Sequence, residues 1–196
     1  MSAVPTRREA THERIVDAAA RVLRRDGYAG VGVADVMKQA GLTHGGFYAH
    51  FGSRDALLVE ATERAGLGSG VAMRERMAAA AARGESTLRA LIEAYLSDAH
   101  LKGTEFGCVV AALSSEMPRQ SQAVRAPSVE RVKKLIALVQ SALPASASKG
   151  QAAVIAATMV GALQLARTLG ANAQGKALLA ATRAALLTQH DAPESR

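Results

Sequence analysis

The sequence predicts an all-α fold of about nine helices, in which a small N-terminal domain of three helices precedes a larger helical domain. Hydrophobic residues make up 49% of the 196 residues, but aromatic residues make up only 3%, and tryptophan is absent. Alanine, leucine and valine must therefore supply the core, which favours helices over a sandwich or barrel. Apolar residues recur at helical spacing between glycine and proline breaks, and no alternating strand pattern competes.

Charge and cysteine content narrow the class of protein. The net charge of +7 favours polyanionic partners, but residues 1–55 carry only +2 of it, with 8 Lys+Arg against 6 Asp+Glu. The single cysteine excludes an intrachain disulfide framework and a multi-cysteine zinc site, and no metal or cofactor is expected. No run approaches the ~20 apolar residues of a membrane span, and no signal-peptide core is visible, so a cytoplasmic location is expected.

Capping residues and glycines give the expected bounds of the first helices. Residues 1–10 are polar and basic and are expected to form a disordered arm. Thr11 is a suitable N-cap for a helix over His12–Asp26, which Gly27 ends. Two short helices are then expected, over Ala34–Ala40 and His44–Phe51.

The larger domain begins with a long fourth helix that Ser53 caps and that can run as far as Ala82. Gly66, Gly68 and Gly70 interrupt it, and each costs about 1 kcal/mol of helix relative to alanine, so a kink or break is expected there. The later helices are expected over Ser86–Lys102, Gly107–Met117, Gln122–Leu143, Lys149–Leu169 and Gly175–Gln189, with Pro127 marking a kink or the true start of the third. The expected divisions are the arm over 1–10, the three-helix domain over 11–55, the larger domain over 56–190 and a frayed tail over 191–196.

The segment Gly27–Leu58 holds the most specific pattern in the chain. Two short helices meet at a tight turn, Ala40-Gly41-Leu42-Thr43. A helix-turn-helix has this arrangement: a support helix, a turn often containing glycine, and a second helix that can enter the major groove of DNA. The alternative is an ordinary helical hairpin, which does not require this order of glycine, tyrosine and phenylalanine.

Helical geometry divides the second helix into faces. Phe47 and Phe51 are four residues apart and are expected to face inward with their neighbours. His44 and Tyr48 lie on a separate stripe, which favours contact with DNA over a core tyrosine or a solvated histidine. Gly45-Gly46 leaves the backbone free to approach DNA closely, at a cost in helix stability.

These residues give the segment a specific resemblance to the N-terminal DNA-binding domain of the TetR family of transcription regulators. The similarity covers residues 11–60 without a gap, through Gly27-Tyr28, Asp35, Ala40-Gly41, Thr43, Gly45, Phe47, Tyr48, Phe51, Ser53 and Asp55. The rest of the chain resembles the family's ligand-binding domain in length, in helix count and near Gly107. The resemblance implies a homodimer, double-stranded operator DNA as its partner, and a small-molecule effector.

The resemblance also implies roles for single positions, through contacts to phosphates and base edges. The expected DNA-binding residues are Thr43, His44, Gly45, Gly46, Tyr48, His50 and Arg54. His44 stands where a lysine or arginine is common, which can make DNA affinity depend on pH. Val31 and Gly32 stand where hydroxyl residues often cap the support helix. For Arg54, a surface charge that pairs with Asp55 or a helix end is an equal alternative.

Cys108 leaves two interpretations open. It follows Gly107 at the expected start of a helix, where backbone N–H groups favour the thiolate, so it is a candidate sensor of oxidants or electrophiles. The apolar run Val109–Leu113 favours the alternative, a buried cysteine that packs as a small apolar residue. The full set of candidate effector-pocket residues is Tyr95, His100, Cys108, Met117 and Gln164. Taken singly, each is more typical of an ordinary core or surface position, and Gln164 is equally suited to a dimer contact.

The last two long helices are candidates for the dimer interface. Val154–Leu169 and Ala177–Leu187 carry broad apolar faces, and the small residues Gly161 and Ala162 allow two helices to approach closely. In the family that the chain resembles, these helices form a four-helix bundle. The alternative is that both faces pack within one chain.

The predicted function is therefore a ligand-responsive DNA-binding regulator that a small molecule releases from a pseudo-palindromic operator. The expected type is a repressor, which is the commoner type in the family that the chain resembles. The glycines between 66 and 70 are candidates to tune the coupling between the two domains. A thiol-based sensor acting through Cys108 is the alternative. A cysteine-dependent enzyme is a weaker rival, because none of the five histidines pairs with Cys108 in a recognisable motif. A non-specific DNA-compacting protein is the other rival.

Overall fold

The computed structural model describes residues 6–191, and its regular structure within them consists of nine α-helices and three short 3-10 helices. The helices are α1 (Arg7–Gly30), α2 (Val33–Gln39), η1 (His44–Ala49), α3 (Arg54–Ala82), α4 (Thr87–Tyr95), α5 (Asp98–Lys102), η2 (Thr104–Phe106), α6 (Val109–Leu113), η3 (Met117–Arg119), α7 (Gln122–Ala142), α8 (Lys149–Leu169) and α9 (Ala173–His190). The all-α prediction is confirmed.

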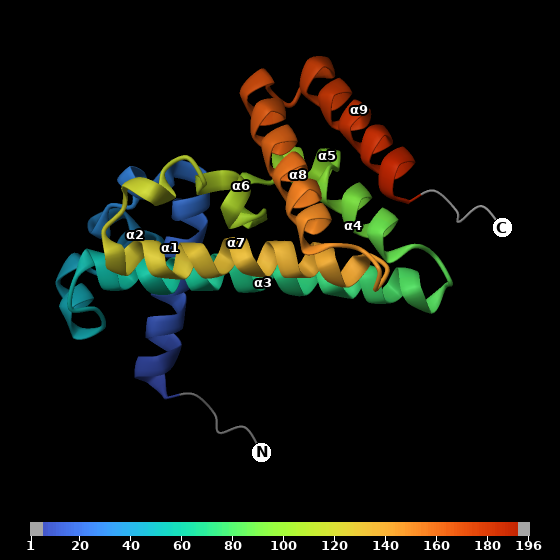
Figure 1. Ribbon diagram of the computed structural model, residues 1–196. Coiled ribbons are helices and arrows are strands. Elements are labelled where there is room, and N and C mark those ends of the chain that lie inside the picture. Colours follow the sequence, from blue (N-terminus) through green and yellow to red (C-terminus); the bar gives the residue numbers. More distant parts are fainter. Residues whose placement is uncertain (1–5, 192–196) are drawn as a thin grey trace.

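The long helices α3 and α7 lie side by side and form the axis of the molecule (Figure 1). Helices α1 and α2 gather at one end of this pair, and α8 and α9 stand together beyond its other half. The N-terminal domain therefore meets the larger domain along α3, which begins next to the helix-turn-helix and extends deep into the larger domain.

Helix α1 begins earlier than the sequence pattern indicated. Thr6 and Glu9 form a capping box, in which the Glu9 N–H donates to Thr6 Oγ1 at 3.3 Å and the Thr6 N–H donates to Glu9 Oε2 at 2.7 Å. The prediction that Thr11 caps this helix is therefore wrong, and residues 7–10 of the expected arm are helical. Residues 1–5 of that arm and residues 192–196 of the expected tail lie outside the described residues. The expected break at Gly27 is confirmed, because the backbone there adopts φ +75°.

Helix α3 is continuous from Arg54 to Ala82, so the predicted kink at Gly66, Gly68 and Gly70 is wrong. Its start is as expected, with Ser53 Oγ accepting from the Ala56 N–H at 3.1 Å. Packing against α1, α4 and α7 offsets the low helix propensity of the glycines.

Two of the later helices are shorter than predicted. The helix expected over Ser86–Lys102 divides into α4 and α5, because Ser97 Oγ accepts from the His100 N–H at 3.1 Å and caps a new helix. The helix expected over Gly107–Met117 shrinks to the five residues of α6. Pro127 is buried inside α7 and neither starts nor ends it.

Helix α8 has the bounds that the sequence predicted. By length and composition alone it is also long and apolar enough to cross a membrane. This is weak evidence for a membrane span, because a helix with a buried face passes the same test. It packs against α7 and α9 and buries Ile155, Met159 and Leu163. Its opposite face leaves Val154 and Leu165 each 60% exposed.

Candidate DNA-binding surface and effector pocket

The segment predicted to contact DNA, the recognition segment, is the 3-10 helix η1, and the short helix expected over His44–Phe51 ends earlier, at Ala49. The Thr43 side chain makes no capping hydrogen bond to it. Two glycines in six residues lower the helix propensity, and packing must hold the segment in place.

The two faces of this segment match the prediction. Phe47 and Phe51 are 1% and 2% exposed, and their rings stack with centroids 5.5 Å apart. Tyr48 is 72% exposed, and its ring meets the edge of Phe47 at 5.2 Å. His44 and Gly45 are exposed beside it. Buried phenylalanines thus support an outer surface of tyrosine, histidine and bare backbone.

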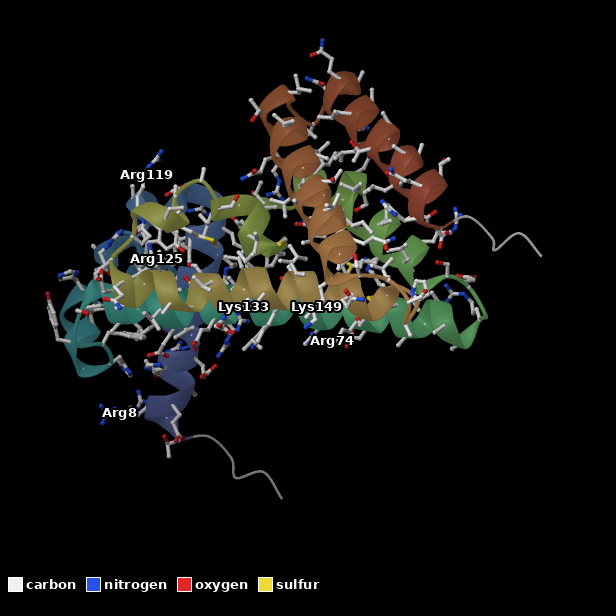
Figure 2. The ribbon with its side chains drawn as sticks, in the orientation of Figure 1. Arg8, Arg74, Arg119, Arg125, Lys133 and Lys149 are labelled. Carbon is white, nitrogen blue, oxygen red and sulfur yellow. The ribbon has the colours of Figure 1, made fainter. Side chains whose placement is uncertain are left out.

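The basic groups next to this surface are partly engaged within the chain. Arg54 is half-buried, and its guanidinium donates from Nε to the Val31 carbonyl at 2.9 Å and from Nη2 to the Tyr28 carbonyl. It therefore holds the end of α1 against the start of α3. His50 is half-buried, and burial, followed by the nearby His12 and Arg8, lowers its pKa. Arg8 lies near the start of α1 and donates to the Ala49 carbonyl at 2.9 Å (Figure 2).

The larger domain contains a cavity of about 600 Å³ lined by residues of α3, α7 and the segment from 94 to 110. Three of the five predicted pocket residues line it: Tyr95, His100 and Cys108. The other two do not line this cavity. Met117 is buried in the core at 5% exposure, and Gln164 donates to Ser114 Oγ at 2.8 Å.

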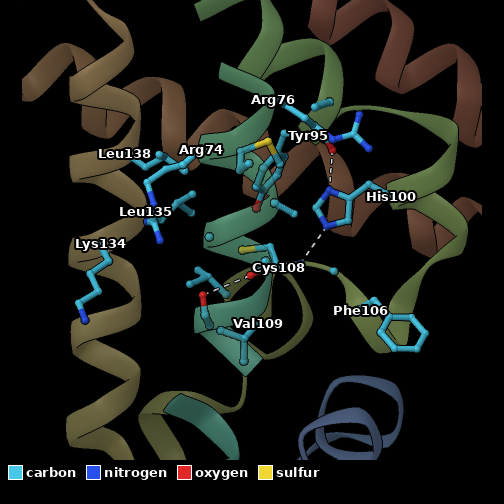
Figure 3. A pocket seen from close by; sticks show the side chains of 18 of the residues that line it. Arg74, Arg76, Tyr95, His100, Phe106, Cys108, Val109, Lys134, Leu135 and Leu138 are labelled. Carbon is cyan, nitrogen blue, oxygen red and sulfur yellow. Dashed lines mark hydrogen bonds between the residues drawn. The ribbon is translucent and has the colours of Figure 1, made fainter. Parts of the chain in front are cut away.

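His100 joins two parts of the pocket wall (Figure 3). The Cys108 N–H donates to His100 Nε2 at 2.9 Å, so Nδ1 carries the ring proton and donates to the Tyr95 carbonyl at 2.7 Å. Burial, followed by the charge of Arg167, lowers the pKa of His100 to about 4. The imidazole is therefore neutral at pH 7 with both nitrogens engaged, and it is not free to act as a base for the Cys108 thiol.

Cys108 combines features of both interpretations that the sequence left open. It is 9% exposed and belongs to the core cluster, yet it also lines the pocket. Tyr95 is 2% exposed, and its hydroxyl has no hydrogen-bond partner among the described residues. Burial, followed by the neighbouring Cys108, raises the pKa of Tyr95 well above its usual value.

Sequence reasoning missed the basic character of the pocket. Its basic lining residues are Arg74, Arg76, Arg131 and Lys134, besides the neutral His100, and no aspartate or glutamate of the described residues lines it. Arg131 is buried, while the other three are exposed. The one available signal was Gly66, since a glycine within a helix can mark the close approach of another group.

Several hydrogen bonds join the pocket region to α1. Arg24 donates to the carbonyls of Ala65, at 2.9 Å, and of Glu105. The Glu105 carboxylate also pairs with Arg25 at 2.8 Å. Near the end of α1, the Tyr28 hydroxyl lies 3.0 Å from Ser128 Oγ of α7. Residues next to the cavity lining in α3 and in the segment before α6, and a residue of α7, are thus bonded to α1.

Comparison with known proteins agrees with this architecture. Residues 15–61 match the family described as bacterial regulatory proteins, tetR family. The HTH-type transcriptional repressor NemR of Escherichia coli strain K12 is 28% identical over 137 residues, which cover 68% of this chain and 67% of NemR. Together these matches support a TetR-family transcription regulator. The chain is accordingly a DNA-binding transcription regulator.

Solved TetR-type structures share the fold over nearly the whole chain. The reduced form of E. coli NemR has a TM-score of 0.77 at 24% identity and covers 95% of this chain and 100% of its own. The regulator FadR of Bacillus subtilis, solved in complex with stearoyl-CoA, has a TM-score of 0.67 at 17% identity and covers 90% and 98%. The TetR fold therefore extends through the pocket-bearing domain.

Proposed function

We propose that the protein is a repressor that binds a pseudo-palindromic operator as a homodimer in the cytoplasm, and that a small molecule in the pocket releases it. One observation carries this proposal. The cavity of about 600 Å³ lies against α3, the helix that follows the recognition segment directly. A ligand that binds better to the DNA-incompetent state shifts the population toward that state by its differential affinity.

The proposed DNA contacts centre on the exposed side of η1. Thr43, His44, Gly45 and Tyr48 are all exposed there, whereas Gly46 is half-buried. His50 lies at the edge of this surface. The internal hydrogen bonds of Arg54 favour a structural role for that residue, because a phosphate contact would have to replace them.

Ligand release is proposed to act through the hydrogen bonds that hold α1. Glu105 precedes the pocket residue Phe106 and binds Arg24 and Arg25 of α1. Ser128 of α7 meets Tyr28 near the end of the same helix. A ligand that displaces either wall therefore moves the helix against which α2 packs.

The proposed dimer interface combines the outer faces of α8 and α9. On α8 the exposed apolar residues are Val154, Leu165 and Leu169. On α9 a row of small exposed side chains follows the helix, at Ala177, Ala180, Ala181, Ala184 and Ala185. Small residues allow close helix approach between two copies. The test is the molecular mass in solution: the wild type should be a dimer, and Leu165→Glu should shift it toward the monomer.

The regulator proposal is tested by selecting DNA from a random pool and measuring its affinity against unselected DNA at fixed salt. We expect the selected sequences to be pseudo-palindromic and to bind at least ~10³-fold more tightly than random DNA. Equal affinity for both would instead indicate phosphate-only binding and a DNA-compacting protein.

A thiol sensor is the second candidate function, because Cys108 lines the pocket beside Tyr95. The Cys108 thiol would add to an activated alkene, forming an S–C bond while its proton passes to the neighbouring carbon. N-ethylmaleimide should then release operator DNA from the wild type but not from Cys108→Ser, with one adduct per chain by mass spectrometry. Equal release of both proteins would contradict a sensor, and repeated turnover would indicate an enzyme.

A further inference from the structure

Arg131 of α7 is a buried arginine that lines the pocket. It is 8% exposed, and its Nε has no hydrogen-bond partner among residues 6–191. No carboxylate among residues 6–191 forms an ion pair with it. Its neighbour Glu130 is exposed and pairs with Lys133 at 2.8 Å. Buried charges in proteins are normally paired, because desolvation is costly.

The rest of the pocket offers no compensating negative charge. Within residues 6–191 no aspartate or glutamate lines it, and its lining includes three exposed cations: Arg74, Arg76 and Lys134. Arg74 lies along the middle of the α3–α7 pair (Figure 2) and lines the cavity together with Leu135 and Leu138 (Figure 3). The cavity thus presents positive charge next to an apolar wall.

Gly66 of α3 makes the position of Arg131 possible. A Cβ at Gly66 would overlap Arg131 Cδ and would lie 2.9 Å from Nη1 and 3.1 Å from Nε. A Cβ at Gly68, two residues further along the same helix, would meet nothing within 4 Å. The guanidinium therefore lies directly across the backbone of α3, where a larger residue would displace it.

We propose that the pocket binds a small molecule that carries an anionic group, a carboxylate or a phosphate, on an apolar body. Arg131 binds the anionic group, since a guanidinium forms paired hydrogen bonds with either oxyanion. The apolar body packs against Met73, Val109, Leu135 and Leu138. This inference rests on the proposed function of the cavity as an effector pocket and names the class of effector.

The anion position is next to the contacts that hold α1. Ser128, which meets Tyr28, is one turn before Arg131 on α7. Ala65, whose carbonyl accepts from Arg24, directly precedes Gly66 on α3. Neutralising Arg131 therefore changes the packing of α3 and α7 where both helices support the DNA-binding domain.

The test is isothermal titration of three probes with the same chain length: octanoate, octyl phosphate and octanol. For the wild type, we expect the better anion to bind roughly 10- to 100-fold more tightly than octanol, as is typical of a hydrogen bond to a charged group. The relative affinities of octanoate and octyl phosphate decide which oxyanion the site prefers. In Arg131→Met, the preference for the anion should fall to about threefold or less, while octanol binding persists.

Gly66→Ala and Gly68→Ala form a matched pair that leaves Arg131 in the chain. Gly66→Ala should reduce the anion preference, because the new Cβ displaces the guanidinium, whereas Gly68→Ala should retain it. If Arg131→Met does not fold, this pair and Arg131→Lys decide the question, with circular dichroism confirming the helical fold.

Two results would overturn the proposal: octanol binding the wild type as tightly as both anions, or an anion preference that survives displacement or removal of Arg131. Binding of selected DNA by the unliganded protein is measured separately. Failure of DNA binding would refute the repressor while leaving the anion preference intact, and failure of the anion preference would leave the repressor standing.

Discussion

The recognition segment and the effector pocket are held in shape by different forces. In the recognition segment, Phe47 and Phe51 pack into the core, and the segment lacks a side-chain cap. In the pocket wall, His100 bridges the Tyr95 carbonyl and the Cys108 N–H through a buried hydrogen-bonded chain. One region therefore depends on apolar packing, and the other on polar groups removed from water.

This difference suits the two regions to different tasks. Apolar packing fixes one arrangement, which suits a surface that must match DNA. In the pocket, Tyr95 Oη and Arg131 Nε are buried polar atoms without hydrogen-bond partners in the described part of the chain. Such groups gain hydrogen bonds when a ligand arrives, so the pocket is the region whose bonding can change on binding.

The largest expected effect on the free energy of unfolding comes from the buried phenylalanine side of the recognition segment. Phe47→Ala should lower the free energy of unfolding by about 3–5 kcal/mol, because it leaves a cavity where a 1% exposed ring was packed. Urea denaturation measures this loss. Tyr48→Ala is the matched control and should change stability by no more than ~0.5 kcal/mol, since its ring is 72% exposed. Equal effects of the two substitutions would refute the packing account.

The pocket wall should instead show a dependence on pH. His100 has a folded-state pKa of about 4 against an ordinary value of 6.5, so the unfolded chain takes up the proton first as pH falls. Its contribution is complete above pH 6.5 and is lost progressively toward pH 4, at about 1.4 kcal/mol per unit of pKa difference and at most a few kcal/mol in all.

His100→Gln isolates that contribution from the carboxylates that titrate in the same range. The variant should be less stable than the wild type at neutral pH, and the gap should narrow as the pH is lowered toward 4. Urea midpoints measured across this range give the comparison. A gap that stays constant with pH would contradict a buried neutral histidine.

The outer face of the recognition segment should affect DNA binding without affecting stability. Tyr48→Ala should weaken binding to selected operator DNA by roughly tenfold, the loss expected for one contact to a phosphate or base edge. Phe106→Ala is the control, because that ring is 70% exposed beside the pocket and far along the chain from η1. Fluorescence anisotropy should show unchanged DNA affinity for Phe106→Ala. Equal losses would remove Tyr48 from the proposed contact surface.

Local patterns allowed much of the N-terminal domain to be predicted. The four-residue spacing of Phe47 and Phe51 correctly predicted that both rings are buried. The predicted breaks at Gly27 and Gly41 coincide with positive φ values of 75° and 72°. The capping box of Thr6 and Glu9 is also visible in the sequence. The helix start was nevertheless predicted at Thr11, because the apolar residues at helical spacing follow that residue. The 3-10 form of η1 was not predictable, because the spacing of apolar residues does not distinguish it from a short α-helix.

The pocket could not be predicted from local patterns, because it is formed by contacts between distant parts of the chain. Gly66 lowers helix propensity, so a kink was the local expectation, but the sequence does not show that Arg131 of α7 occupies the space above it. Tyr95, His100 and Cys108 were selected as polar groups on apolar helices, and that criterion also selected Met117 and Gln164, which lie elsewhere. Only the tertiary packing separates the two groups.

The smallest expected effect concerns the bond that joins the two regions. Tyr28 and Ser128 are 2% and 1% exposed, and their hydroxyl oxygens lie 3.0 Å apart between α1 and α7. Tyr28→Phe should cost about 1 kcal/mol, because the Ser128 hydroxyl still donates to the Val124 carbonyl at 3.4 Å. Ser128→Ala should cost somewhat more, since it leaves the tyrosine hydroxyl buried without a partner.

A double-mutant cycle then separates this bond from the packing around it. The coupling energy between Tyr28→Phe and Ser128→Ala should be about 0.5–1.5 kcal/mol in the free energy of unfolding. If the bond transmits pocket occupancy to the DNA-binding domain, the same pair should also reduce ligand-induced release of DNA, while each variant still binds DNA in the absence of ligand. Additive stabilities together with unchanged release would show that α1 and α7 communicate elsewhere, leaving the ion pair between Arg25 and Glu105 as the connection to test.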